Sequence, residues 1–133
     1  MRSFLEPLLR SPELPQCLEN SRNARVLARE VMSAFDSESR RRGLLGRASL
    51  PEGSALIIAP CSAVHTFFMR FAIDVAFVTK DGRVLKIRQA VPPWRMTAAL
   101  RAFAVIELPA GALHHADTIV GDTLRLSTRQ LGL

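Results

Sequence analysis

A succession of short apolar runs, each ended by a turn signal, occupies the sequence from residue 55 onward. The runs have the length of β-strands, and Gly, Pro or Asp residues separate them. They are SALIIAP, HTFFM, IDVAFVT, RVLKIRQ, FAVIELP and DTLRLST. Strands that follow one another through short turns pair in antiparallel fashion. The chain is therefore expected to be an α+β protein whose main element is an antiparallel sheet.

The segment FDSESRRRGLLGR, residues 35–47, predicts one short helix on the N-terminal side of the sheet. Asp36 or Ser37 can cap its start, arginines suit its C-terminal end, and Gly43 or Gly46 can terminate it. Two other segments are less decisive. Residues 24–35 fit both strand alternation and a helical stripe, and AGALHHADTI, residues 110–119, is typical of a short helix or a turn.

The length of 133 residues fits a single small domain, and a hydrophobic content of 48% argues against disorder. Residues 1–22 contain three prolines and little periodicity, so we expect an irregular arm with one helical turn at FLEPLL, followed by the domain over residues 23–133. Glu6 and Pro7 interrupt the apolar start, and no segment is apolar for the ~18 residues of a membrane span. We therefore expect a cytoplasmic protein, with export only if the true start lies upstream.

The turn TKDGR allows two hairpin registers. If residues 80–82 form a three-residue loop with Gly82 left-handed, Phe77 faces Leu85 and one face of the hairpin is apolar. If residues 81–82 alone form the loop, Phe77 faces Lys86 and the face is mixed. The hydrophobic pattern favours the first register.

The run HTFFMRFAID, residues 65–74, places three polar side chains among apolar neighbours, where burial is costly. His65 is expected to be a hydrogen-bonded residue at the start of a strand. The favoured register places Asp74 opposite Arg88 as a cross-strand charge pair. A single strand over residues 65–79 would be unusually long, so a bulge or kink within residues 70–73 is expected to turn Arg70 toward Asp74.

Several short motifs together resemble the DUF192 family. They are GLLGR at 43–47, CSAVHTFFMRFAIDVAFV at 61–78, the DGRVL hairpin, PWR at 93–95, VIELPAG at 105–111 and GDTLRL at 121–126. Their order and spacing follow the family over residues 36–127. DUF192 is a domain of unknown function found mainly in prokaryotes. The resemblance implies a small α+β domain with a curled, largely antiparallel sheet, and it implies no established activity.

Polar residues concentrate in the segments that carry this resemblance. We expect a small non-enzymatic binding module for an anionic or saccharide-like small molecule or for a protein segment, because arginine binds planar anions and indole stacks on apolar faces. The candidate ligand-binding residues are His65, Arg70, Asp74, Trp94, Arg95 and Glu107.

Cys61 and His65 support a second hypothesis, a cysteine-dependent hydrolase or transferase in which His65 is the base and Asp74 orients it. Metal binding is not expected, because zinc needs three or four ligands and the other candidates have no recognised spacing to Cys61. No other cofactor is expected, because the chain lacks a phosphate-binding glycine loop and a dinucleotide fingerprint.

Nucleic-acid binding is a third hypothesis, since the formal net charge is +6 and only Lys80 and Lys86 among the 18 basic residues are lysines. An aromatic content of 6% without tyrosine supplies few stacking residues, so nucleic acid is not the favoured partner. The RRR run at 40–42 is interpreted as a solvated helix face in preference to an anion clamp. The sequence indicates no oligomeric state.

Overall fold

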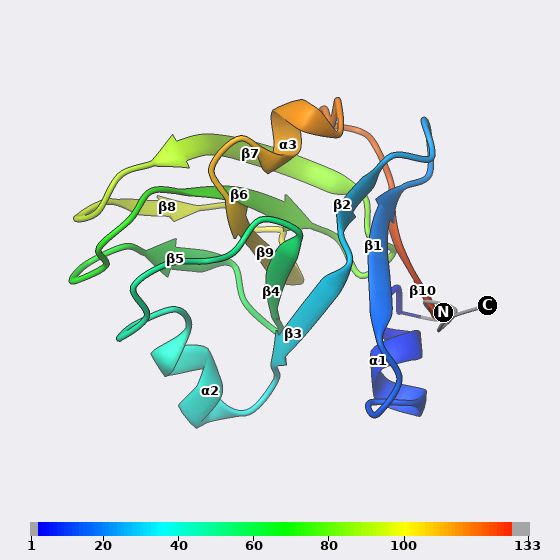
Figure 1. The fold of residues 1–133 in the computed structure, drawn as a ribbon, viewed down its shortest axis with the longest axis horizontal. Helices are drawn as coiled ribbons and strands as arrows, with labels where there is room; N and C mark the ends of the chain where they lie inside the picture. The colour runs from blue at the N-terminus through cyan, green and yellow to red at the C-terminus, as the bar shows by residue number, and fades with distance from the viewer. Residues whose placement is uncertain (1–2, 129–133) are drawn as a thin grey trace.

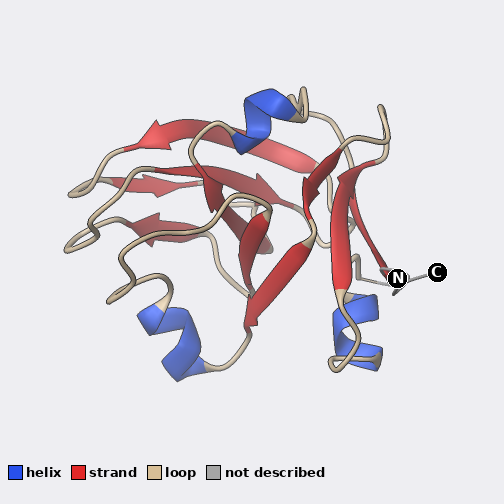
Figure 2. Cartoon of the chain, viewed as in Figure 1, coloured by secondary structure: helices blue, strands red, loops and turns tan. Residues whose placement is uncertain are grey.

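The structure, a computed structural model, describes residues 3–128. Its helices are α1 (Glu6–Arg10), α2 (Ser37–Arg42) and α3 (Ala112–His115). Its strands are β1 (Gln16–Asn20), β2 (Val26–Ala28), β3 (Glu30–Ala34), β4 (Ser54–Ile58), β5 (Ala63–His65), β6 (Ile73–Val78), β7 (Val84–Val91), β8 (Met96–Ala98), β9 (Ala104–Pro109) and β10 (Leu124–Thr128). The helices lie at the periphery of the strands (Figure 2), and the expected α+β class is confirmed.

The strands form three sheets (Figure 1). The central sheet has the order β3-β4-β9-β6-β7, a second sheet has the order β10-β1-β2, and β5 pairs with β8 in a two-stranded ribbon. Strand β3 runs parallel to β4, and every other pair is antiparallel. No helix in residues 3–128 has the length and apolar character needed to cross a bilayer.

Both faces of the central sheet are buried along its inner strands β4, β9 and β6. Alternate residues of β9 belong to two separate apolar clusters, with Ile106 and Leu108 in one and Val105 in the other. The first cluster includes Leu18 from β1, so it packs the central sheet against the second sheet. The second includes Leu44 from the turn after α2, and it lies on the opposite face. A polar side chain on either face of β9 is therefore enclosed by packing.

The N-terminal residues differ from the irregular arm expected over residues 1–22. Helix α1 matches the helical turn expected at FLEPLL, but β1 is an integral strand that pairs with β10 and β2. Leu18 is fully buried in the core. The stability of β1 comes from partners more than a hundred residues away, which a local sequence pattern does not reveal.

The segment that fitted both a strand and a helix forms two strands, β2 and β3. The expected helix that follows is confirmed as α2. Asp36 caps it, because the Asp36 Oδ1 atom accepts a hydrogen bond of 2.8 Å from the Ser39 backbone N–H. This donor lowers the pKa of the Asp36 carboxyl. Gly43 ends the helix with a positive φ of 48°, which glycine adopts more readily than other residues.

The hairpin between β6 and β7 has the expected loop but not the expected register. The Thr79 N–H donates to the Arg83 carbonyl at 2.9 Å, and Gly82 has φ of 88°, so residues 80–82 form the loop. A bulge then shifts the pairing, and Phe77 lies opposite Lys86 instead of Leu85. The prediction assumed one buried face, whereas every residue of β6 is buried.

The run at residues 65–74 is interrupted by a loop, not by the kink expected within residues 70–73. Strand β5 ends at His65 and β6 begins at Ile73, so most of the HTFFM segment is outside any strand. Phe68 adopts φ of 65°, far from the extended backbone of a regular strand. The bulge between Phe77 and Val78 also removes the expected pairing of Asp74 with Arg88, because Val75 lies opposite Arg88.

Candidate functional site

A pocket of about 430 Å³ lies between α2 and the second apolar face of the central sheet. Helix α2, the turn that follows it, the end of β4, strand β5 and one residue of β9 supply its walls. The lining residues are Ser37, Arg40, Arg41, Arg42, Gly43, Leu44, Leu45, Ile58, Pro60, Cys61, Ala63, Val64, His65, Met69 and Glu107. The pocket therefore combines an apolar wall with a small number of charged groups, as ligand sites do.

Glu107 is the acidic group of this pocket. It lies on β9 between Leu56 of β4 and Val75 of β6, and it is only 3% exposed. No hydrogen bond or ion pair to its carboxylate occurs among the described residues. Burial alone raises the pKa of Glu107 from 4.5 to about 7. A carboxylate in an apolar sheet face without a protein partner is costly for folding, so the charged form of Glu107 is disfavoured.

Gly43 brings the backbone close to this carboxylate. A Cβ atom placed at residue 43 would lie 3.7 Å from the Glu107 Oε1 atom, in ordinary contact. The left-handed φ of 48° is favourable for glycine and strained for other residues. The glycine that ends α2 therefore also turns the chain at the mouth of the pocket beside Glu107.

Three arginines of α2 form the basic side of the pocket. Arg42 makes an ion pair of 3.2 Å with Glu38, while Arg40 and Arg41 donate to the Ser37 hydroxyl and carbonyl at 3.4 and 3.3 Å. Neither Arg40 nor Arg41 forms a close ion pair among the described residues, although Arg40 is near enough to Asp36 to help lower the pKa of that carboxyl. The RRR run was interpreted as a solvated helix face, and Arg41 and Arg42 are indeed exposed, while all three arginines also line the pocket.

Cys61 and His65 also line the pocket, but they do not contact one another through a hydrogen bond. The Cys61 thiol donates to the Ala63 carbonyl at 3.1 Å. The His65 Nδ1 atom accepts a hydrogen bond of 3.3 Å from the Phe67 backbone N–H. The thiol and the imidazole are thus each engaged with the backbone, without the thiol–imidazole hydrogen bond that an activated nucleophile uses.

The six predicted site residues fall into three places. His65 and Glu107 line the pocket. Asp74 is fully buried and its carboxylate accepts hydrogen bonds from backbone N–H groups. The other three lie on exposed loops outside the pocket lining, and they are Arg70, Trp94 and Arg95. The α2 arginines and Gly43 also line the pocket and are not among the six predicted site residues, although the RRRG sequence was an available signal.

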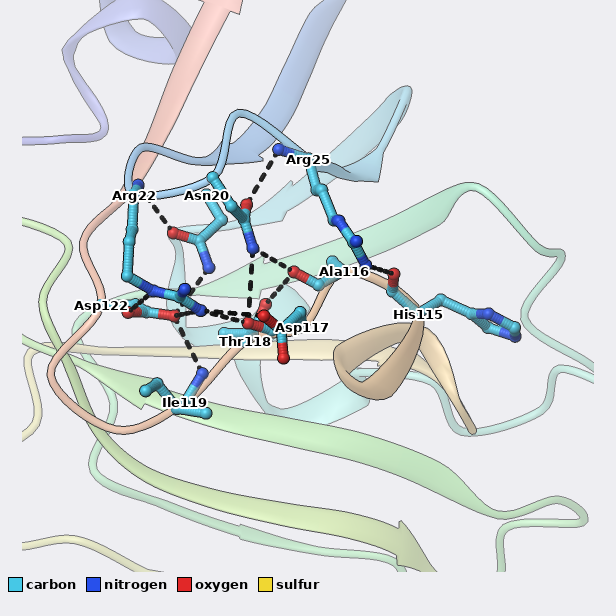
Figure 3. Close-up of polar contacts among 10 residues, drawn as sticks. Asn20, Arg22, Arg25, His115, Ala116, Asp117, Thr118, Ile119 and Asp122 are labelled. Atoms are coloured by element: carbon cyan, nitrogen blue, oxygen red, sulfur yellow. Dashed lines mark hydrogen bonds and ion pairs between the residues drawn. The ribbon is translucent and has the colours of Figure 1, made fainter.

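A second polar cluster joins the β1–β2 turn to the segment before β10 (Figure 3). The Asp122 carboxylate accepts hydrogen bonds from Asn20 and Arg22 at 2.7 Å each and from the Ile119 backbone N–H at 2.9 Å. Arg22 also contacts Asp117. The hydrogen bond from Arg22 is the main reason that the pKa of Asp122 is lowered to about 2. All these groups are mutually satisfied, so the cluster is structural.

Metal ligands are not grouped in the described part of the chain. Residues 3–128 contain no set of three or more His, Cys, Asp or Glu side chains that could hold a metal ion. His114 and His115 are both exposed on α3, with ring centroids 6.4 Å apart.

Two solved structures are similar to this fold. One is a protein of unknown function from Novosphingobium aromaticivorans DSM 12444, with a TM-score of 0.72 and 22% identity over 84% of this chain and 83% of that one. The other, from Sinorhizobium meliloti 1021, is described as a "putative transcription regulator", and it has a TM-score of 0.73 and 19% identity over 84% of this chain and 92% of that one. Similarity at these identities shows the fold alone. No curated protein matches the sequence.

The sequence pattern of DUF192, described as "Uncharacterized ACR", matches residues 18–126. The match covers most of the chain, and it spans α2, β5 and β9, which supply the pocket. The resemblance of the short motifs is thereby confirmed. The chain belongs to the DUF192 family.

Proposed function

We propose that the pocket beside α2 binds a small hydroxylated organic anion, such as a sugar acid. The observation that carries this proposal is the isolated carboxylate of Glu107. Burial disfavours the charged form of Glu107 and raises its pKa to about 7, and no donor from the described residues offsets this effect. A ligand hydroxyl that donates to Glu107 would supply the missing partner.

The residues around Glu107 favour a particular charge, carbon skeleton and size in the proposed ligand. The guanidinium groups of Arg40 and Arg41 line the pocket without a close ion pair among the described residues, and they can bind an anionic group. Leu44, Ile58 and Met69 provide an apolar wall for a carbon skeleton. The volume of about 430 Å³ is within the range of small-molecule sites. The preferred ligand therefore has a donor at one end and a negative charge at the other.

Thermal-shift and calorimetric measurements with a panel of sugar acids, hydroxy acids and sugar phosphates test the proposal. At least one compound should raise the melting temperature of the parent protein. Arg40→Ala should weaken the binding of that compound about tenfold, whereas Arg10→Ala, an equal loss of charge on α1, should leave binding unchanged. The proposal is wrong if no compound stabilises the parent or if both variants behave alike.

The Glu107→Leu variant distinguishes the contribution of Glu107 to ligand binding from its effect on folding stability. The substitution replaces an isolated buried carboxylate with an apolar side chain of similar size, so the ligand-free variant should melt at a higher temperature than the parent. It should also lose the ligand-induced shift. A variant that is stabilised and still binds the compound would show that Glu107 takes no part in the site.

A further inference from the structure

Large apolar side chains are exposed together at one edge of the molecule. The loop between β5 and β6 and the loop between β7 and β8 reach the same edge, on the left in Figure 1. Phe68 is 72% exposed, Trp94 is 55% exposed and Met96 is 70% exposed. We call these three residues together with Phe67 the aromatic tip. Contiguous exposed apolar groups of this size mark interaction surfaces.

The aromatic side chains of the tip pack against one another. The ring centroids of Phe68 and Trp94 are 4.6 Å apart in an edge-to-face arrangement, and those of Phe67 and Trp94 are 5.9 Å apart. His65 stacks on Phe67 at 5.0 Å. The tip is therefore formed before any partner arrives, so little side-chain entropy is lost on contact.

Thr66 holds the two loops of the tip together. Its backbone accepts from the Trp94 N–H at 3.0 Å and donates to the Arg95 carbonyl at 2.8 Å. Its hydroxyl donates to the Pro92 carbonyl at 2.6 Å and accepts from the Arg95 N–H at 3.0 Å. Thr66 is only 1% exposed, so these bonds are protected from water. They fix the position of one loop relative to the other.

The backbone at the tip is strained. Phe68 has φ of 65° and Trp94 has φ of 68°, in the left-handed region that bulky residues rarely adopt. Each such residue costs on the order of 1 kcal/mol or more, and strain of this kind persists where the surrounding structure enforces it. The Thr66 hydrogen bonds hold the two loops in this strained conformation. The strained backbone and the Thr66 hydrogen bonds together hold large aromatic rings in solvent. Packing in the protein core therefore does not explain this arrangement.

Positive charge surrounds the tip. Arg70 and Arg95 lie in the two loops that form it, and both are exposed. Residues 62–73 and 82–106 contain no Asp or Glu. A partner that contacts the tip therefore meets apolar groups and cations without a competing negative charge.

We propose that the aromatic tip docks on the surface of a membrane that contains anionic lipids. Tryptophan and phenylalanine favour the interface between headgroups and acyl chains, which is where a protruding tip would place Phe68, Trp94 and Met96. Arg70 and Arg95 then contact the lipid phosphates. The charge pattern favours this partner over a protein surface, because it complements a uniform sheet of negative charge. The docking is independent of the function proposed for the pocket.

Intrinsic fluorescence tests the proposal directly, because Trp94 is the only tryptophan and the chain has no tyrosine. The protein is mixed with vesicles of phosphatidylcholine alone or with added phosphatidylglycerol. Vesicles with phosphatidylglycerol should shift the Trp94 emission to shorter wavelength and protect it from acrylamide, and the neutral vesicles should have much less effect. Absence of any shift with the anionic vesicles would overturn the proposal.

Substitutions test whether the aromatic tip is the part of the protein that contacts the vesicles. Phe68→Ala should reduce partitioning into anionic vesicles about tenfold, and Arg70→Ala should reduce it about fivefold. Leu9→Ala and Arg10→Ala are the matched controls, because both lie on α1, on the right of Figure 1, and Leu9 is 60% exposed. Both controls should partition as the parent does.

Three other results would contradict the proposal. Vesicle binding without a change in Trp94 fluorescence would show adsorption through another basic surface. Equal losses in Phe68→Ala and Leu9→Ala would show that the tip is not the contact. A fluorescence shift that depends on protein concentration without vesicles would show that a second copy of the chain covers the tip.

Discussion

The carboxylate of Asp74 lies against the first turn of α3, where its Oδ2 atom accepts a hydrogen bond of 3.0 Å from the Leu113 backbone N–H. The same oxygen accepts from the Gly111 N–H at 3.1 Å, and Oδ1 accepts from the Ala90 N–H at 2.8 Å. Asp74 thus connects β6 to the far end of β7 and to the turn before α3. Its full burial is explained by these three donors, because hydrogen bonds to a charged group are stronger than neutral ones.

Asp74→Asn should destabilise the protein by about 2–4 kcal/mol, because the amide presents donors where the native oxygens accept from N–H groups. Urea unfolding at neutral pH measures the loss. Asp81→Asn, at an exposed position in the β6–β7 loop, should change stability by less than about 0.5 kcal/mol. Equal stability of Asp74→Asn and the parent would show that the three hydrogen bonds contribute little.

Gly82→Ala should destabilise the protein far more than Gly121→Ala. Both glycines have left-handed backbones, with φ of 88° and 97°. A Cβ at residue 82 would overlap the Leu124 carbonyl oxygen, whereas a Cβ at residue 121 would meet no atom within 4 Å. We expect a loss of about 1 kcal/mol for Gly121→Ala and roughly 3 kcal/mol or more for Gly82→Ala, measured by urea unfolding. Similar losses would mean that the loop can move away from β10.

The hairpin shows how far the sequence determines the fold. The TKDGR sequence predicted the loop, since Gly82 supplies the left-handed residue that it requires. The register beyond the loop depended on which face was buried. Because β6 is buried on both faces, alternation of apolar residues carried no information, and the bulge at Leu85 moved the pairing by one residue.

The candidate site was less predictable than the sheet. Glu107 could be suspected because it interrupts an apolar run, but its isolation depends on how α2 packs across β9. That packing is tertiary and leaves no local periodicity. For the same reason, the sequence grouped His65 with Trp94 and Glu107, although Trp94 lies on the tip and Glu107 lines the pocket. The sequence motifs alone do not show whether two of their residues lie on the same surface of a domain.

Asp122→Asn should lower the free energy of unfolding at neutral pH. It should also make that free energy depend less on pH in the acid range. The pKa of Asp122 is about 2 in the folded protein against 3.8 for an ordinary aspartate, mainly because Arg22 donates to it. Since the unfolded chain takes up the proton first, the stabilisation is present above pH 3.8 and is lost as the pH falls toward 2. We expect a loss of about 1–3 kcal/mol at pH 7.

Unfolding of the parent and the variant in urea at pH 7 and at pH 2 checks this expectation. The difference in unfolding free energy between the parent and the variant should shrink toward zero at pH 2, provided both proteins remain folded without denaturant. Asp117→Asn is the control, because that side chain is 60% exposed and should change stability only slightly. A difference that is constant with pH would show that the Asp122 charge is not linked to folding.

Glu107→Gln should have the opposite dependence on pH. The pKa of Glu107 is about 7 in the folded protein and near 4.5 when unperturbed, because burial disfavours its charged form. Between these values the folded chain holds a proton that the unfolded chain has released, so stability falls as the pH rises from about 4.5 to about 7. The amide never ionises, so the variant should exceed the parent at pH 8 by up to about 3 kcal/mol.

Urea unfolding of the ligand-free proteins at pH 4 and at pH 8 measures this difference directly. At pH 4 the parent carboxyl is protonated in both states, so the variant and the parent should have similar free energies of unfolding. Glu52→Gln, at an exposed position between α2 and β4, should match the parent at both values. If the Glu107→Gln difference is the same at pH 4 and pH 8, the carboxylate has a partner in solution, and the argument for a ligand donor at this position fails.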